Sequence, residues 1–124
     1  MPETSLPALT RTATERPHTY YLRTPEQQAA YNAWKRSVAI VAASQVLDVT
    51  SSYGMRELNP LLADSSQRFG MKAAGIKLGA SAAILAAQYW MVKTHPGKAR
   101  RMTILNYAGA ALTSAFAAHN FSIR

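Results

Sequence analysis

The sequence predicts an all-α fold, a bundle of three transmembrane helices that follows an extended N-terminal arm. Three observations support this prediction. Charged residues form only 16% of the 124-residue chain, well below the roughly 25% of an average soluble domain. Apolar residues gather in three segments, at about 37–55, 72–92 and 102–120, each near the roughly 20 residues that a helix needs to cross a bilayer. Residues that cap or break helices stand between these segments.

A chain of this length forms one domain at most. We divide it into an extended arm at 1–23 and a helical membrane domain at 24–124. The arm is rich in Thr, Pro and Arg and has no helical period, as is typical of an extended segment. The apolar segments are rich in alanine and only mildly hydrophobic, so a soluble helical bundle is the alternative.

The first helix is expected to begin at Thr24 and to run without a break to Gly54. Thr24 can accept a hydrogen bond at the helix start, Pro25 suits the first helical position, and Gln27 completes a capping box. The second helix is expected to begin at a similar signature, Asp64–Gln67, and to continue to about residue 92.

The third helix should follow a break at Thr94-His95-Pro96-Gly97, because proline cannot continue a helix. It is expected to end near residue 119 or 120. Three spans would then place the two chain ends on opposite sides of the membrane.

The formal net charge is +8, and the basic residues flank the apolar segments. Nucleic-acid binding would need a basic face with base-reading or stacking groups, so no nucleic-acid partner is expected. Flanking charge more commonly reflects membrane orientation and contact with anionic lipid. The bias predicts a multi-pass protein of the cell inner membrane, with a cytoplasmic N-terminus and an outside C-terminus.

Asp48 lies near the end of the first apolar segment and Lys77 near the start of the second. At about 1.5 Å per residue, both lie roughly 8–9 Å below the same membrane surface, so their side chains are expected to meet. A buried acid–base pair removes much of the cost that each charge carries alone in lipid. The alternative is that Lys77 snorkels independently to the head groups.

Ser44, Ser51 and Ser52 share a helix face with Asp48, at i−4, i+3 and i+4. Lipid offers no hydrogen bonds, so this face should point into the bundle or at a partner. With Lys77, these residues form a predicted intramembrane polar network. Such a stripe serves either an ion path or, much more commonly, hydrogen bonding between helices.

The outer turn contains Glu57, Asn59 and Pro60. An Asn before Pro initiates turns, and this segment is either an ordinary surface turn or one that dips back into the membrane. The candidate partners of the Glu57 carboxylate are Arg56, Arg68 and Lys72.

Gly75 and Gly79 form a G-x-x-x-G pattern in the second segment, and Gly109 begins a stripe of small residues in the third. Small residues at four-residue spacing let helix backbones approach closely in lipid. We expect close packing through these glycines, within the protein or against a neighbour.

No metal or cofactor site is expected. The chain has no cysteine, which excludes disulfides and thiolate ligands, and no histidine has a second ligand at metal spacing. His119 is a candidate for the single axial ligand of a haem or chlorophyll. Phosphate-loop and nucleophile-elbow motifs are lacking, so an enzyme is not expected.

The run Asp48-x-x-Ser51-Ser52, then Glu57-x-Asn59-Pro60, then Lys77 resembles the small bacterial membrane proteins of the domain-of-unknown-function family DUF5658. Members of that family have an Asp-x-x-Thr-Thr, Glu-x-Asn-Pro and Lys pattern, and serines stand here where threonine is usual. The likeness covers about 38–120. It implies a short multi-spanning fold and brings no activity with it.

Two functions are consistent with these features. The first is a small accessory or structural subunit that packs against a larger membrane protein complex. The second is a small oligomeric transport or ion-coupling protein that uses Asp48 and Lys77. Three helices barely enclose a path, so the second function would require oligomerisation.

Overall fold

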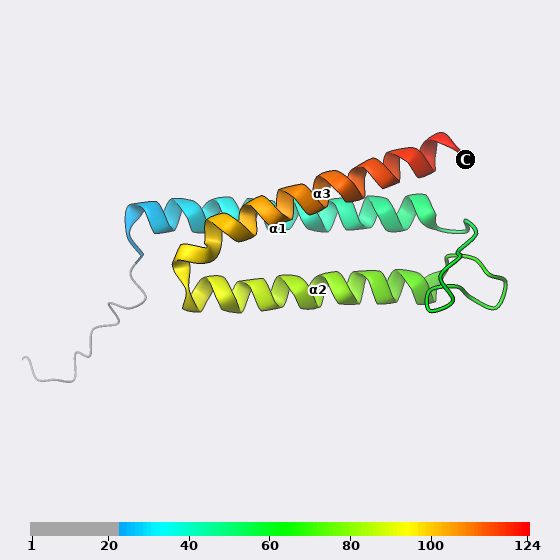
Figure 1. The fold of residues 1–124 in the computed structure, drawn as a ribbon, viewed down its shortest axis with the longest axis horizontal. Coiled ribbons are helices and arrows are strands. Elements are labelled where there is room, and N and C mark those ends of the chain that lie inside the picture. The colour runs from blue at the N-terminus through cyan, green and yellow to red at the C-terminus, as the bar shows by residue number, and fades with distance from the viewer. Residues whose placement is uncertain (1–22) are drawn as a thin grey trace, which may run out of the picture.

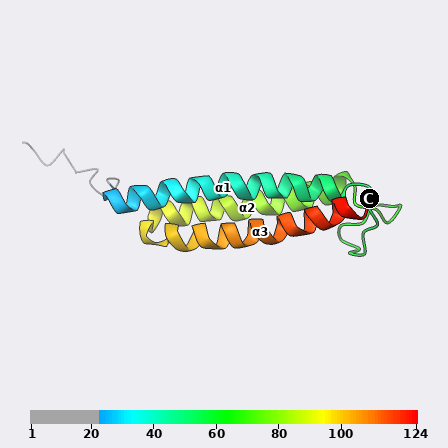
Figure 2. The same ribbon diagram turned by 90° about the horizontal axis from the view of Figure 1, so that it is seen from above.

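The computed structural model describes residues 23–124, which form three α-helices and one short 3₁₀ helix. The helices are α1 (Pro25–Ser52), α2 (Met71–Thr94) and α3 (Ala99–Ser122), and the 3₁₀ helix is η2 (Pro96–Lys98). Figures 1 and 2 show α1 and α3 running in the same direction, with α2 antiparallel to both. The all-α, three-helix prediction is confirmed, whereas the predicted arm lies almost wholly outside the described residues.

The start of α1 follows the predicted capping box. The Thr24 side chain accepts a hydrogen bond from the backbone N–H of Gln27 at 3.1 Å, and the Gln27 side chain accepts one from the N–H of Thr24 at 3.0 Å. Pro25 occupies the first helical position. The helix then continues for 28 residues and stops before Gly54, whose φ of +81° is a left-handed conformation that favours glycine.

The predicted start of α2 at Asp64 is wrong, because the Asp64 side chain closes a tight turn instead. Its Oδ1 accepts hydrogen bonds from the N–H of Ser66 and of Arg68, both at 2.9 Å, and from the Ser66 hydroxyl at 2.7 Å. Gln67 has a φ of +58°, which a right-handed helix cannot contain. Local side-chain bonds of this kind compete with a helix start, so α2 begins only after Gly70.

The segment 53–70 between α1 and α2 folds back on the end of the bundle. Antiparallel bridges join Arg56 to Arg68 and Ala63 to Phe69. The Arg68 guanidinium also donates a hydrogen bond to the Gly54 carbonyl at 2.9 Å. Phe69 is buried, and it packs with the first turn of α2. This connection is therefore an ordered cap on the bundle.

The helices pack unequally. α1 packs chiefly on α3, whereas α2 has far fewer contacts with α1. Two small apolar clusters lie at opposite ends of α2. One cluster contains Trp34, Val92 and Ala99, and the other is built around Phe69 and the start of α2. Figure 1 shows α2 lying beside α1 along its length.

Small and polar side chains fill the interior of the bundle. The buried residues of α1 are Trp34, Ser37, Ser44, Asp48 and Ser51, and those of α3 are Ala99, Asn106, Ala110 and Ala117. The α1 positions recur at intervals of three, four and seven, the spacing of a seam between two close helices. The large apolar side chains point outward instead, among them Ile84, Leu112 and Phe116, which are 60%, 60% and 57% exposed.

In the part of the chain that the structure describes, no helix is both long enough and apolar enough to meet the usual criterion for crossing a membrane. The prediction of three helices is thus confirmed at the level of secondary structure, and this criterion does not support the predicted transmembrane character.

The Asp64 turn yields a pH-dependent prediction. Hydrogen bonds from the N–H of Arg68 and from Ser66 stabilise the carboxylate and hold the pKa of Asp64 below its ordinary value of 3.8. The stabilisation is therefore present above pH 3.8 and is lost as the pH falls through the lowered pKa. The amide proton signals of Ser66 and Arg68 should shift together in this acidic range in an NMR titration.

Asp64→Asn is the control for that titration, because it removes the titrating group and should abolish the shift. A midpoint at or above 3.8 in the unmodified protein would contradict the hydrogen-bonded turn.

Candidate functional site

Polar side chains occur along the interior of the bundle from one end to the other, and we call this set the polar interior. It consists of Trp34, Ser37, Gln45, Asp48, Ser51, Ser52, Lys77, Gln88, Asn106, Thr113 and Asn120. These residues come from all three helices. Most of their hydrogen bonds join one helix to another.

The first group of the polar interior connects all three helices near the start of α1. The indole N–H of Trp34 donates to Gln88 Oε1 at 3.0 Å, and Gln88 Nε2 donates to Asn106 Oδ1 at 2.8 Å. Asn106 Nδ2 in turn donates to the Ser37 hydroxyl at 2.9 Å. Ser37 closes the group by donating to the Trp34 carbonyl at 2.7 Å.

Sequence reasoning missed Gln88 and Asn106 as interior residues. Each stands in a long apolar segment, where an amide needs a hydrogen-bonding partner if it is buried. The presence of an amide inside an otherwise apolar stretch was the signal that could have identified these two residues. The partner of each amide depends on how α2 and α3 face each other, which the local sequence does not contain.

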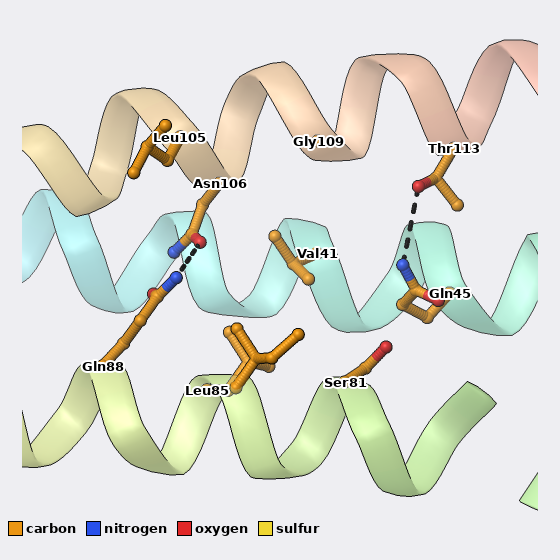
Figure 3. Close-up of a pocket in the computed structure, with 10 residues that line it drawn as sticks. Val41, Gln45, Ser81, Leu85, Gln88, Leu105, Asn106, Gly109 and Thr113 are labelled. Carbon is orange, nitrogen blue, oxygen red and sulfur yellow. Dashed lines mark hydrogen bonds between the residues drawn. The ribbon is translucent and has the colours of Figure 1, made fainter. Parts of the chain in front are cut away.

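The middle of the polar interior is more weakly joined. Gln45 Nε2 lies 3.5 Å from Thr113 Oγ1, at the outer limit of a hydrogen bond (Figure 3). Near the other end, Asn120 Nδ2 reaches the hydroxyls of Ser51 and Ser52 at 3.3 and 3.0 Å. Both contacts link α1 to α3.

Asp48 and Lys77 lie together, as their matched positions on antiparallel helices predicted. Lys77 Nζ is 2.7 Å from Asp48 Oδ2, and the two side chains are 32% and 9% exposed. The ammonium also lies 5.2 Å from the centre of the Phe69 ring, within the range of a cation–π contact. Lys77 thus directs its charge at α1 and at the buried cap residue.

The serines around Asp48 face the interior but do not bind its carboxylate. Ser44 and Ser51 donate to backbone carbonyls of their own helix, at 2.8 and 2.9 Å. Ser51 and Ser52 additionally accept the bonds from Asn120. The predicted polar face therefore consists of one ion pair to α2 and separate hydroxyl contacts to α3.

The outer turn motif builds the loop. Glu57 Oε1 accepts a hydrogen bond from the N–H of Asn59 at 2.9 Å, and Asn59 Oδ1 accepts one from the N–H of Leu61 at 3.0 Å. Pro60 lies between these residues, in a turn that the Asn side chain closes. Within residues 23–124 the ion pair of Asp48 and Lys77 is the only one, so none of the basic partners considered for Glu57 pairs with it.

The three predicted packing glycines make no close contact with another helix of the same chain. Gly75, Gly79 and Gly109 are exposed, and a Cβ atom added to any of them would meet nothing within 4 Å. Close packing through these glycines inside the described bundle is therefore wrong, and packing against a neighbour is the alternative that still stands. His119 is exposed near the end of α3.

The chemistry of the polar interior is that of cohesion between helices. Among the described residues, no buried side-chain nitrogen or oxygen lacks a hydrogen-bond partner. No group of three or more His, Cys, Asp or Glu side chains in this part of the chain could hold a metal ion. The arrangement can join three helices, and it contains one buried carboxylate whose charge has a single partner.

The Asp48–Lys77 pair predicts non-additive substitutions. Asp48→Asn or Lys77→Met alone should lower the free energy of unfolding by about 3 kcal/mol, the lower end for loss of one partner of a buried pair, because Lys77 is one-third exposed. The double variant should recover much of this loss, since a whole pair can be replaced. Denaturant unfolding in detergent measures the free energy of unfolding of the two single variants and of the double variant.

Lys72→Met is the matched control, because Lys72 is an exposed lysine of the same helix. It should change stability by less than about 0.5 kcal/mol. Simple addition of the two single effects in the double variant would show that the pair does not interact.

Comparison with protein-family models, with curated proteins and with solved structures finds no match to this chain. A function must therefore be inferred from the arrangement of its own residues.

Proposed function

We propose that the chain is an integral membrane protein of the cell inner membrane that serves as a small accessory subunit of a larger membrane protein complex. The observation that carries this proposal is the inverted distribution of polarity. Polar and small side chains occupy the interior, while large apolar side chains cover the outside.

The outward apolar surface would be costly in water. Burial of apolar surface is worth roughly 25 cal/mol per Å², so a water-soluble bundle places its large side chains inside. Here Trp90 is 65% exposed, whereas Ser37 and Ser51 are fully buried. In lipid the preference is the opposite, because small residues let helices approach and polar groups find partners only inside the protein. The inverted pattern therefore favours lipid as the surroundings.

The internal polar groups account for the modest apolarity of the helices. Gln45 and Asp48 lie inside the apolar segment 37–55, Lys77 and Gln88 lie inside the segment 72–92, and each has a partner on another helix. A charged or amide group with an internal partner costs far less at membrane depth than one that faces lipid.

Aromatic and basic residues at one end of the bundle support the proposed orientation. Tyr31, Trp34 and Tyr89 lie close to one another there, with ring centres 5.7 and 6.2 Å apart. Arg23 lies over the Tyr31 ring at 3.7 Å, and Lys93 lies 5.6 Å from the Tyr89 ring centre. Aromatic rings with adjacent cations are typical of the membrane interface, and an excess of cations is typical of the cytoplasmic side.

The subunit role is supported by the outward face of α2. Gly75 and Gly79 lie there, with Ala83 and Ala87 following at the same spacing, and all four are exposed. A smooth stripe of this kind allows a foreign helix to approach closely. Transport through Asp48 and Lys77 is the second candidate, which the buried pair favours. Every fully buried side-chain nitrogen and oxygen of the described residues has a hydrogen-bond partner, which favours cohesion over an open path.

The resemblance to the family DUF5658 is part of this proposal. Its pattern residues Asp48 and Lys77 form the interhelical ion pair, and Glu57 and Asn59 build the outer turn. A structural role for all of these residues is consistent with a protein that is not an enzyme.

Membrane integration is tested by extraction. The protein should stay with the membrane pellet in alkaline carbonate, which removes peripheral proteins, and should be released by mild detergent. Its backbone polar groups would be satisfied within helices in lipid, so no salt or pH change should release it. Recovery of the chain in the carbonate supernatant would overturn the proposed location.

The subunit role is tested by a change on the outward face of α2. Gly79→Leu should abolish co-purification of a stoichiometric partner in mild detergent, because the added side chain prevents close helix approach. Ala115→Leu adds similar bulk to an exposed site of α3 and should leave co-purification unchanged. A homo-oligomer that persists in both variants would instead favour the transport function.

A further inference from the structure

A pocket lies between the three helices (Figure 3). Its volume is about 330 Å³. Val41 and Gln45 come from α1, Ser81 and Leu85 from α2, and Gly109 and Thr113 from α3. Because Gly109 has no side chain, α3 leaves this space open.

Hydrogen-bonding groups without full partners face this pocket. The Ser81 hydroxyl of α2 has no hydrogen bond within the described residues, whereas the Ser37, Ser44 and Ser51 hydroxyls of α1 donate to carbonyls of their own helix. Figure 3 shows the Ser81 oxygen directed towards Gln45. The Gln45 amide makes only the 3.5 Å contact to Thr113. This part of the polar interior is therefore the one that is incompletely bonded.

The remaining lining determines which ligand class fits. No charged side chain lines the pocket, so a charged ligand would lose its hydration without a counter-charge. Leu85, Val41 and their neighbours form apolar walls. The volume is at the lower end of the roughly 300–1,000 Å³ range of small-molecule sites. A whole helix, about 10 Å or more in diameter, does not fit.

Three free donors are available in the pocket. Ser81 offers its O–H, Thr113 offers its O–H because its oxygen accepts from Gln45, and the Gln45 amide offers a second N–H. Gln45 Oε1 and the two hydroxyl oxygens can also accept hydrogen bonds. A carbonyl oxygen accepts two hydrogen bonds, so it can take donors from two of these groups at once.

We propose that this pocket binds an uncharged, lipid-soluble molecule with a carbonyl group, whose oxygen accepts hydrogen bonds from Ser81 and Gln45. The remainder of the molecule lies against the apolar walls and over Gly109. The inference rests on the proposed membrane location for the source of the ligand, since such a molecule would enter from the lipid phase. Few convergent polar groups in an apolar pocket are the usual composition of a small-molecule site.

The experiment uses the purified full-length protein in detergent and 2-decyl-1,4-benzoquinone as the probe. Quinones quench indole emission, and Trp34 is hydrogen-bonded to Gln88, which lines the pocket. A Trp90→Phe background leaves Trp34 as the sole tryptophan. The quinone should quench Trp34 saturably. Decylbenzene, which lacks the carbonyl, should compete at least about 5-fold more weakly, the value of one or more hydrogen bonds.

Three variants and one control decide the outcome. Ser81→Ala and Gln45→Leu should each weaken quinone binding about 5-fold or more, and Gly109→Leu should abolish it by filling the pocket. Ser114→Ala removes a hydroxyl of α3 that does not line the pocket and should have no effect. Far-UV circular dichroism verifies that each variant is folded. Ser81→Ala removes a single oxygen atom and is therefore the variant that disturbs the fold least.

Equal quenching in the unmodified protein and in folded Ser81→Ala and Gly109→Leu would overturn the proposal, because the quinone would then reside in the detergent. Equal competition by decylbenzene would also overturn it and would assign the pocket to a hydrocarbon chain. Failure of the membrane proposal is recognised separately, by carbonate extraction.

Discussion

Two side chains of α2, Gln88 and Lys77, make its polar contacts with the other two helices, and the attachment of α2 to the bundle depends on them. α1 and α3 pack closely along their length, but α2 meets them mainly at its ends. Gln88 joins one half of α2 to Trp34 and Asn106, and Lys77 joins the other half to Asp48. Under the proposed membrane location the hydrophobic effect would not press the helices together, and hydrogen bonds and an ion pair at separated points would hold the third helix.

The same constraint explains the choice of side chains on the other two helices. Ser37, Ser44 and Ser51 recur at heptad spacing on α1, and Ala110 and Ala117 line the facing side of α3. Small side chains allow close approach, and serine hydroxyls satisfy themselves on carbonyls of their own helix. α1 and α3 pack closely, α2 has far fewer contacts with α1, and a pocket lies between the three helices. Cohesion and the proposed ligand space thus follow from one arrangement.

The connection 53–70 also holds the helices together, at the end of the bundle where α1 ends and α2 begins. Phe69 is buried against the start of α2 and lies near the Lys77 ammonium. The C-terminal Arg124 side chain donates to the Tyr53 carbonyl, which ties the end of α3 to the end of α1. Glu57 and Asn59 shape the turn and take no part in the polar interior. Residues of one short sequence pattern therefore perform two structural tasks, an ion pair between helices and a loop fold.

Local sequence determined the helices and the cap at Thr24, because capping, backbone restriction and apolar clustering act over a few residues. It also indicated that Asp48 and Lys77 would meet, since they lie at matched distances from the ends of two antiparallel helices. The start of α2 was also decided locally, by the turn that the Asp64 side chain closes, although the sequence pattern there is typical of a helix start. Tertiary arrangement decided the partners of Gln88 and Asn106. Packing between distant segments sets the rotation of each helix about its own axis. The rotations of all three helices must be known before one can say which amides and glycines face the interior and where a pocket lies.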